Sequence, residues 1–262
     1  MVIPCIDMKI ILIGAGNLAT QLAVALQKKG MTPAYIYSRT RESAEQLSER
    51  LRDVPYSTDI SRVPTDGDLY IFAVKDSALL DLVSRMPSNR GLWVHTAGSM
   101  DMEVFAPYTA RYGVFYPMQT FSKERETDFD DIPIFVETNH TDDTERLQEL
   151  SGRLSTKVYE ATSEQRKYLH LAAVFACNFT NHLYALCDRI LSEHGLPFET
   201  MLPLIRETAV KVADIPPAQA QTGPAIRYDK NVIDKQMALL SDPTMRQIYD
   251  LMSRSIHETN KH

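Results

Sequence analysis

Residues 9–19 have the sequence KIILIGAGNLA, in which an apolar run is followed by Gly14, Gly16 and Ala19 at the spacing G-x-G-x-x-A. Glycine at the first two positions permits a tight turn and a close approach of the main chain to a pyrophosphate, and a small third residue lets the next helix pack on its strand. An Ala/Leu-rich helical pattern follows up to Lys29, and its first N–H groups would face the phosphates. Strand, turn and helix together predict a Rossmann-type dinucleotide site.

The end of the second apolar run, residues 34–37 (AYIY), indicates which dinucleotide binds. A site selective for NAD carries Asp or Glu here to accept hydrogen bonds from the ribose 2'-hydroxyl, whereas this chain has Ser38, Arg39 and Thr40. A guanidinium offers donors to a 2'-phosphate, and the two hydroxyls add further donors. The sequence therefore favours NADP. The alternative is that Thr40 only caps the next helix, over residues 41–51, while Arg39 is solvated.

The composition is that of an ordinary globular protein. The 262 residues are 44% apolar and carry a formal net charge of −6, and this length allows two modest domains with cores of their own. The lack of basic runs argues against a nucleic-acid partner, and the mild acidity argues against an anionic membrane surface. The segment before the first strand is too short for a signal peptide and no apolar stretch approaches a membrane span, so we expect a cytoplasmic protein.

The cysteine and histidine content gives no sign of a metal site. Cys5, Cys177 and Cys187 are odd in number and are not spaced as metal-binding pairs, and the histidines are scattered. We therefore expect no metal and expect the cysteines to be reduced packing residues.

The chain changes its pattern at about residue 160. Before this point, short β-rich runs alternate with helical segments, which predicts a mainly parallel sheet with helices on both faces. The runs expected to be strands are IILIG, AYIY, DLYIFAV, LWVHTAG, YGVFYP, PIFVET and KVYEA. After this point only helical patterns occur. The predicted fold is thus an α/β Rossmann domain over residues 1–160 and an all-α domain over residues 161–262.

The helical half begins with an unusually long apolar pattern. Residues 162–194 keep helical spacing, which predicts a helix on the order of 45 Å long. Apolar side chains on more than one side of it favour a homodimer that forms through the helical domain. Further helices are expected over residues 198–214, 229–240 and 243–259, with a non-helical stretch, PPAQAQTGPA, over residues 216–225.

Small or polar residues stand where three of the apolar runs end. These stretches are AVKD at 73–76, HTAGS at 95–99 and YPMQT at 116–120. Ligands of parallel α/β sheets bind beyond the carboxyl ends of the strands, so we expect these stretches to line the cofactor crevice.

The glycine turn, SRT at 38–40, AVKD, HTAGS and YPMQTF together resemble the superfamily of pyrroline-5-carboxylate reductase and the deazaflavin-linked NADP oxidoreductases. YLHLAA at 168–173, Asn178 and TGPAIR at 222–227 are similar to a branch that joins the Rossmann domain to an uncharacterised helical domain. The resemblance spans nearly the whole chain. It implies an NADP-dependent oxidoreductase whose helical domain, of the 6-phosphogluconate dehydrogenase C-terminal type, serves as dimerisation surface and substrate wall.

The resemblance also implies which residues contact the cofactor. Those expected at the pyrophosphate are Gly14, Gly16, Asn17, Leu18 and Ala19. Those expected at the 2'-phosphate are Ser38, Arg39 and Thr40. Those expected along the adenosine and ribose are Ala73, Val74 and Lys75, and those near the nicotinamide are Thr96, Ala97 and Gly98.

The long helix carries the candidate catalytic residues His170 and Asn178. A histidine can protonate the oxygen or nitrogen that gains charge as hydride arrives, and the alternative is a core histidine bonded to a backbone carbonyl. Asparagine is a poor interior helix residue unless its amide is used, so Asn178 either positions substrate or bridges helices. Eight residues correspond to a rotation of about 80° in an α-helix, so both could border one pocket. The lysine of the β-hydroxyacid dehydrogenases, one turn before an asparagine, has no counterpart here.

Three further residues are candidates for substrate binding. Gln119 and Thr120, after a strand end, could donate hydrogen bonds to a carbonyl or carboxylate. Arg227 could pair with an acidic group of the substrate, and its alternative is a salt bridge with Asp229 or Asp234. Its surroundings, TGPAIRYD, depart from the Ser/Thr-rich loop of the pyrroline reductases, so specificity for a proline precursor does not follow.

The leading hypothesis is an NADPH-dependent reductase that transfers hydride to a C=N or C=O group of a small anionic metabolite. The alternatives are a non-catalytic NADP-binding sensor and a 2-ketoacid reductase of the ketopantoate or hydroxyacid type.

Overall fold

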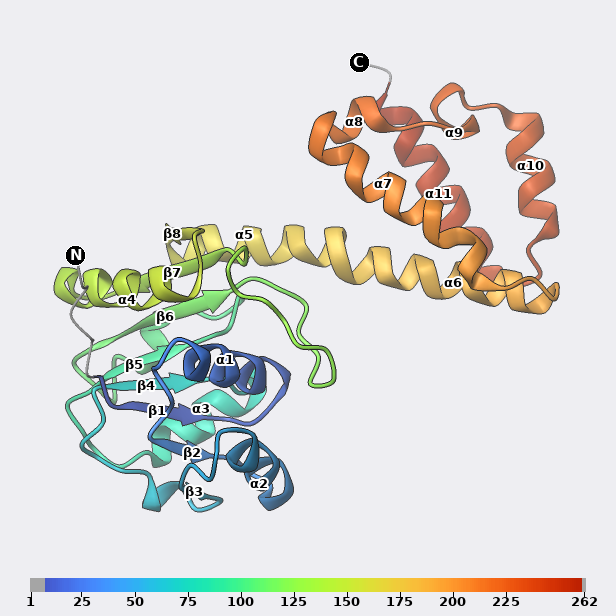
Figure 1. Ribbon diagram of the computed structural model, residues 1–262. Coiled ribbons are helices and arrows are strands. Elements are labelled where there is room, and N and C mark those ends of the chain that lie inside the picture. Colours follow the sequence, from blue (N-terminus) through green and yellow to red (C-terminus); the bar gives the residue numbers. More distant parts are fainter. Residues whose placement is uncertain (1–7, 261–262) are drawn as a thin grey trace. The chain divides into compact units, whose positions relative to one another are not determined.

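The computed structural model describes residues 8–260. Cys5 and the start of the segment before the first strand, on which sequence predictions were made, lie outside the described residues. The chain divides into two compact units, Met1–Cys177 and Asn178–His262. In Figure 1 the sheet of the first unit and its helices run from blue through green to the yellow α5, and helices α7 to α11 of the second are orange to red.

The first unit is built on one eight-stranded sheet with the order β3-β2-β1-β4-β5-β6-β7-β8. The strands are β1 (Ile10–Ile13), β2 (Tyr35–Tyr37), β3 (Tyr56–Ser57), β4 (Leu69–Phe72), β5 (Leu92–His95), β6 (Tyr112–Pro117), β7 (Ile134–Thr138) and β8 (Val158–Glu160). Neighbouring strands are parallel except β6 and β7. The predicted strands are confirmed, and the two-residue β3 was missed. The strand order reverses between β1 and β4, where sheets of this type open a ligand crevice.

Helices cover both faces of this sheet, as predicted. They are α1 (Asn17–Lys28), α2 (Arg41–Arg50), α3 (Asp76–Arg85), α4 (Thr141–Leu154) and α5 (Ser163–Ala173). Because side chains alternate along a strand, β1 contributes Ile10 and Leu12 to the core beneath α1, α2 and α4. It contributes Ile11 and Ile13 to the core beneath α3 on the other face. The carboxyl ends of the parallel strands are thereby fixed at one edge.

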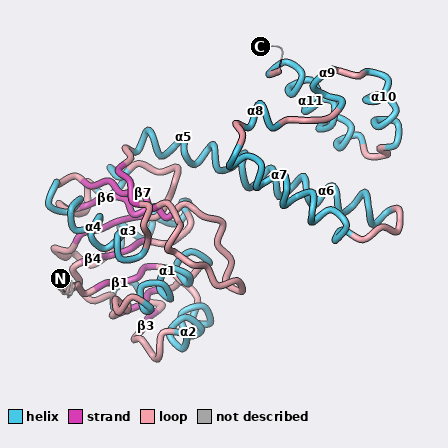
Figure 2. Tube along the Cα trace, turned by 45° about the horizontal axis from the view of Figure 1, so that its top comes forward, coloured by secondary structure: helices cyan, strands magenta, loops and turns pink. Residues whose placement is uncertain are grey.

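The rest of the chain is helical, and Figure 2 shows it as cyan helices joined by pink loops. The helices are α6 (Thr180–Glu193), α7 (Leu202–Asp214), α8 (Pro217–Ala220), α9 (Pro224–Arg227), α10 (Lys230–Leu239) and α11 (Pro243–Thr259). The prediction that residues 216–225 are non-helical was wrong, because α8 and α9 each form a single turn with proline at its first position. No helix within residues 8–260 is long and apolar enough to cross a membrane.

The predicted long helix forms over residues 163–193, but it is not uniform. Residues Val174–Phe179 between α5 and α6 form a π-helix, in which the rotation per residue differs from that of an α-helix. The rotation of about 80° expected between His170 and Asn178 therefore does not apply. Cys177 and Cys187 are free thiols, and Cys177 is exposed, so the prediction that it is a packing residue was wrong.

The second unit buries few apolar side chains of its own. Ile233 and Met245 are the only buried apolar residues within the described residues 178–260. Large exposed apolar side chains in this unit include Leu183, Leu204, Val210, Leu239 and Leu251. Apolar burial is the main stabilising contribution to a fold, so this unit lacks a core proportionate to its size.

Candidate cofactor and active site

The glycine turn between β1 and α1 leaves room for a phosphate. Gly14 has a φ of +124°, and a Cβ there would lie 2.3 Å from the carbonyl oxygen of Ala73, so glycine is required. Gly16 is the N-cap of α1, and a Cβ there would meet nothing within 4 Å. No side chain caps this helix and its first turn holds no acidic residue. Its first N–H groups thus have no capping side chain, and the turn fits a pyrophosphate.

The residues after β2 suit a second phosphate. Ser38 is buried, whereas Arg39 and Thr40 are exposed. Thr40 is the N-cap of α2, as the alternative predicted, but its hydroxyl makes no capping hydrogen bond. No ion pair in the described part of the chain involves Arg39. A guanidinium without an acidic partner and a hydroxyl at a helix N-terminus are the donors that a 2'-phosphate needs.

The next two strand ends lie beside the glycine turn, because β1, β4 and β5 are neighbouring parallel strands. Ala73 is buried, Val74 is half-buried, and Lys75 is the exposed N-cap residue of α3. Thr96 donates from its main-chain N and its hydroxyl to the Phe72 carbonyl, at 3.2 and 3.4 Å, and so ties the two strand ends together. The expected adenosine and nicotinamide loops therefore share one edge of the sheet.

His95, at the end of β5, is a fully buried neutral histidine. Its Nδ1 accepts from the Ala97 N–H at 3.2 Å, so the ring proton is on Nε2, which faces the Asp101 carbonyl at 3.3 Å. Burial, with the nearby positive charge of Arg166, lowers the pKa of His95 to about 4. Both ring nitrogens thus serve to fix the loop expected at the nicotinamide.

Lowering the pH from 7.5 to 5 is expected to destabilise the protein by about 2 kcal/mol through His95. The unfolded chain binds a proton near the ordinary pKa of 6.5, whereas the folded chain does so only near 4, so acid favours unfolding between these values. Urea unfolding at both pH values measures the loss. In His95→Gln, only the contribution of the other groups should remain, and an equal pH dependence in both proteins would contradict the assignment.

His170 lies directly against the 96–98 loop. A Cβ on Gly98 would be 2.6 Å from His170 Nδ1. The ring therefore packs against the Gly98 backbone, where any larger residue would collide with it. The same nitrogen is 3.1 Å from the hydroxyl of Tyr116, at the end of β6. Burial raises the pKa of Tyr116, which keeps its hydroxyl protonated. The structure thus places a histidine, held by a phenol, at the carboxyl end of the sheet.

Arg166, one helical turn before His170, joins α5 to β7 and to the loop that His170 contacts. Its fully buried guanidinium bonds Glu137 Oε2 at 2.7 Å and the carbonyls of Ala97 (3.2 Å) and Met100. Ser163, at the start of α5, donates to the same carboxylate from its hydroxyl and its main chain at 2.7 and 2.9 Å. These contacts bind α5 to β7 and to the 97–100 loop.

Sequence reasoning placed Tyr116 in a stretch expected to line the crevice but did not predict its bond to His170, and it missed Arg166. An arginine on an amphipathic helix is usually solvated, and a tyrosine in a strand usually packs in a core. The available signal for Arg166 was its position four residues before His170, on the same face of the helix.

The other candidates are placed as follows. Gln119 and Thr120 are exposed after β6, and Gln119 Oε1 accepts from the Thr120 N–H at 2.8 Å. Asn178 and Arg227 are exposed residues of the second unit. Within the residues that the structure describes, Arg227 forms no ion pair with Asp229, whose carboxylate instead caps α10.

Comparison with known sequences identifies the family. Residues 3–118 match a Rossmann-like domain, and residues 132–256 match the domain of unknown function DUF2520. A proposed NADP oxidoreductase from Bacteroides fragilis is 52% identical, over 96% of this chain and 98% of that one, with a TM-score of 0.90. The chain belongs to the family of this oxidoreductase. The two domain matches confirm the predicted pairing of a Rossmann domain with an uncharacterised helical domain.

More distant structures share the fold of this protein. A reductive aminase from Aspergillus terreus, in complex with NADPH and ethyl levulinate, is 15% identical with a TM-score of 0.70, over 96% of this chain and 94% of that one. A pyrroline-5-carboxylate reductase from Coxiella burnetii is 16% identical with a TM-score of 0.59, over 97% of both chains. No curated protein matches the sequence.

Proposed function

We propose that this protein is an NADPH-dependent reductase that transfers hydride to a C=N or C=O carbon of a small anionic metabolite, with His170 as the proton donor. The main support is that His170 contacts the backbone at Gly98 and is hydrogen-bonded to Tyr116 at 3.1 Å. This position of the His170 ring, against the loop expected to hold the nicotinamide, supports its role as the proton donor.

The cofactor is NADP, whose reduced form, NADPH, would supply the hydride when it is bound. The 14–19 turn and the first N–H groups of α1 would hold its pyrophosphate, and Ser38, Arg39 and Thr40 its 2'-phosphate. The loops at 73–75 and 96–98 would position its adenosine and nicotinamide. With the cofactor fixed in this way, the protein's contribution to the hydride step is the orientation of the reacting groups.

His170 would supply the proton through Nε2. In the imidazolium form, Nδ1–H donates to the Tyr116 oxygen, and Nε2–H is left to donate to the substrate. When the Nε2 proton has moved to the oxygen or nitrogen that gains charge, the bond to Tyr116 holds the neutral ring in place. Gln119 and Thr120 are the proposed donors to a substrate carbonyl or carboxylate. Asn178 and Arg227 remain sequence predictions.

Cofactor titration and a substrate screen test this function. We expect NADPH to bind at least about tenfold more tightly than NADH, because Arg39 replaces the acid of an NAD site. Imines, ketones and 2-ketoacids are then screened by the absorbance of NADPH, with Arg39→Ala as the matched variant that should lose the preference. Tight NADPH binding without turnover of any of them would instead support the non-catalytic sensor.

A homodimer is the expected assembly. The second unit buries only Ile233 and Met245 among its apolar side chains between residues 178 and 260, and a second copy would cover the exposed ones. Light scattering that shows a monomer at micromolar concentration would contradict this.

A further inference from the structure

The segment between β6 and β7 is tied to the two helices that follow the expected phosphate sites. We define residues 119–128 as the strap. Asn17 Nδ2 donates to the Phe121 carbonyl at 3.1 Å, and Gln21 of α1 bonds the Ser122 carbonyl at 2.7 Å and the Thr127 N–H at 3.1 Å. The strap therefore has a fixed position over α1.

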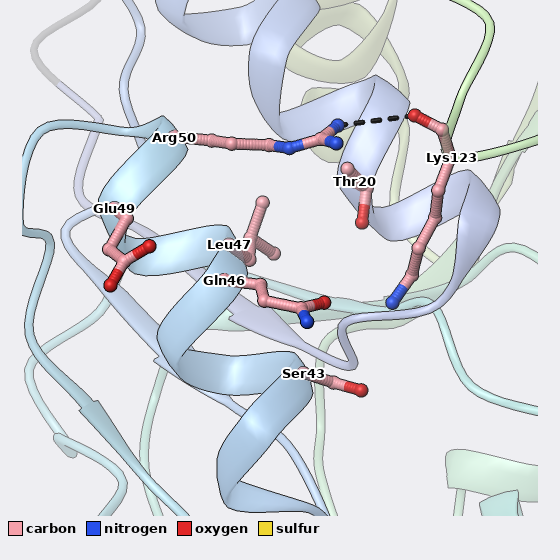
Figure 3. A pocket seen from close by; sticks show the side chains of 7 residues that line it. All are labelled: Thr20, Ser43, Gln46, Leu47, Glu49, Arg50 and Lys123. Atoms are coloured by element: carbon pink, nitrogen blue, oxygen red, sulfur yellow. Dashed lines mark hydrogen bonds between the residues drawn. The ribbon is translucent and has the colours of Figure 1, made fainter.

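The strap also borders a pocket of about 170 Å³ between α1 and α2. Arg50 Nη1 of α2 donates to the main-chain carbonyl of Lys123 at 3.2 Å and so ties the strap to the second helix. Figure 3 shows the Lys123 side chain extending from this bond, with its ammonium end toward the pocket. The residues that line the pocket are Thr20, Ser43, Gln46, Leu47, Glu49, Arg50 and Lys123.

The Lys123 ammonium has no anionic partner within residues 8–260, although Lys123 is only partly exposed. Its neighbours differ in this respect, since Lys28 pairs with Glu126 and Lys29 pairs with Asp130 at 3.1 Å. Glu49 also lines the pocket but forms no ion pair with Lys123. A partly desolvated cation among hydroxyl and amide groups is a site suited to an anion.

The pocket begins one helical turn from the expected phosphate contacts. Ser43 is in the first turn of α2, three residues after Thr40, and Thr20 is in the first turn of α1, four residues after Gly16. A lysine side chain is long and flexible enough to place its ammonium group one helical turn away. We propose that Lys123, with Ser43, binds the adenosine 2'-phosphate of NADP and thereby helps to select NADP over NAD. This inference rests on the proposed function.

Calorimetric titration of Lys123→Ala tests the proposal without any substrate. We expect the Kd for NADP+ to rise about tenfold or more, because a charge-assisted contact is lost, and the Kd for NAD+ to change less than about twofold. The Kd for adenosine 2',5'-bisphosphate should rise as the Kd for NADP+ does, and the Kd for 5'-AMP should not. Lys123→Arg keeps the charge and should stay close to wild type. The bond from Arg50 uses main-chain oxygen, so these variants keep the strap tied.

Lys157→Ala is the matched control, because it removes the same charge from an exposed lysine that pairs with Asp131. If Lys123→Ala has a lower melting temperature than the wild-type protein, the measurement is repeated with Lys123→Gln. Equal weakening of NADP+ and NAD+ would place Lys123 at the pyrophosphate and overturn the proposal, as would an unchanged preference. If the wild-type protein binds NADP+ selectively but turns over none of the screened substrates, the proposed reductase function is refuted and this inference still holds. Wild type with no preference would overturn both.

Discussion

Replacing Arg166 with methionine is expected to lower the free energy of unfolding by about 3–5 kcal/mol. The guanidinium is fully buried, and its removal leaves the Glu137 carboxylate with only the neutral donors of Ser163, and the carbonyls of Ala97 and Met100 without their donor. Methionine nearly fills the space, so the loss arises from the unpaired polar groups and not from a cavity. Urea unfolding of both proteins at pH 7.5 measures the difference.

Two further variants show whether the buried charge is the cause. The double variant Arg166→Met/Glu137→Gln should recover part of the loss, because it removes the unpaired carboxylate. Lys167→Met, next along the helix, removes only a surface pair with Asp101 at 3.8 Å and should cost less than about 1 kcal/mol. A loss below about 1 kcal/mol in Arg166→Met would show that the pair does not hold α5 to the sheet.

Replacing His170 with alanine is expected to reduce turnover about 100-fold or more, while the Kd for NADPH stays within about threefold. The proton donor is removed, but the residues expected at both phosphates are untouched. Single-turnover oxidation of NADPH, with a substrate found by the screen, separates the chemical step from cofactor binding.

Tyr116→Phe should reduce turnover less, because the histidine remains but loses the bond that holds its ring. His140→Ala is the control. This exposed histidine is the N-cap residue of α4 and contacts the Ala110 carbonyl, and it has no proposed role in the site. An unchanged rate in His170→Ala would remove this residue from the mechanism.

Local sequence patterns predicted most of the fold. The spacing of β1, the glycine turn and α1 identified the cofactor domain, because each depends on neighbouring residues. The single-turn helices α8 and α9 and the π-helical Val174–Phe179 left no such periodic signal.

The candidate site was predicted only where its residues are close together in the sequence. The bond between Tyr116 and His170 joins residues 54 apart, and that between Arg50 and Lys123 joins residues 73 apart. Contacts of this kind arise from the crossing of strands and helices, which a single sequence does not encode in any short window. Lys123 in particular gains its importance only when the strap crosses α1 and α2.

Tyr116 and Lys123 are seven residues apart on one peptide. The residue bonded to the proposed proton donor and the residue proposed at the 2'-phosphate therefore lie on one short segment, which Asn17 and Gln21 hold over α1. A substitution that displaced this segment would alter both sites, so cofactor selectivity and turnover would change together.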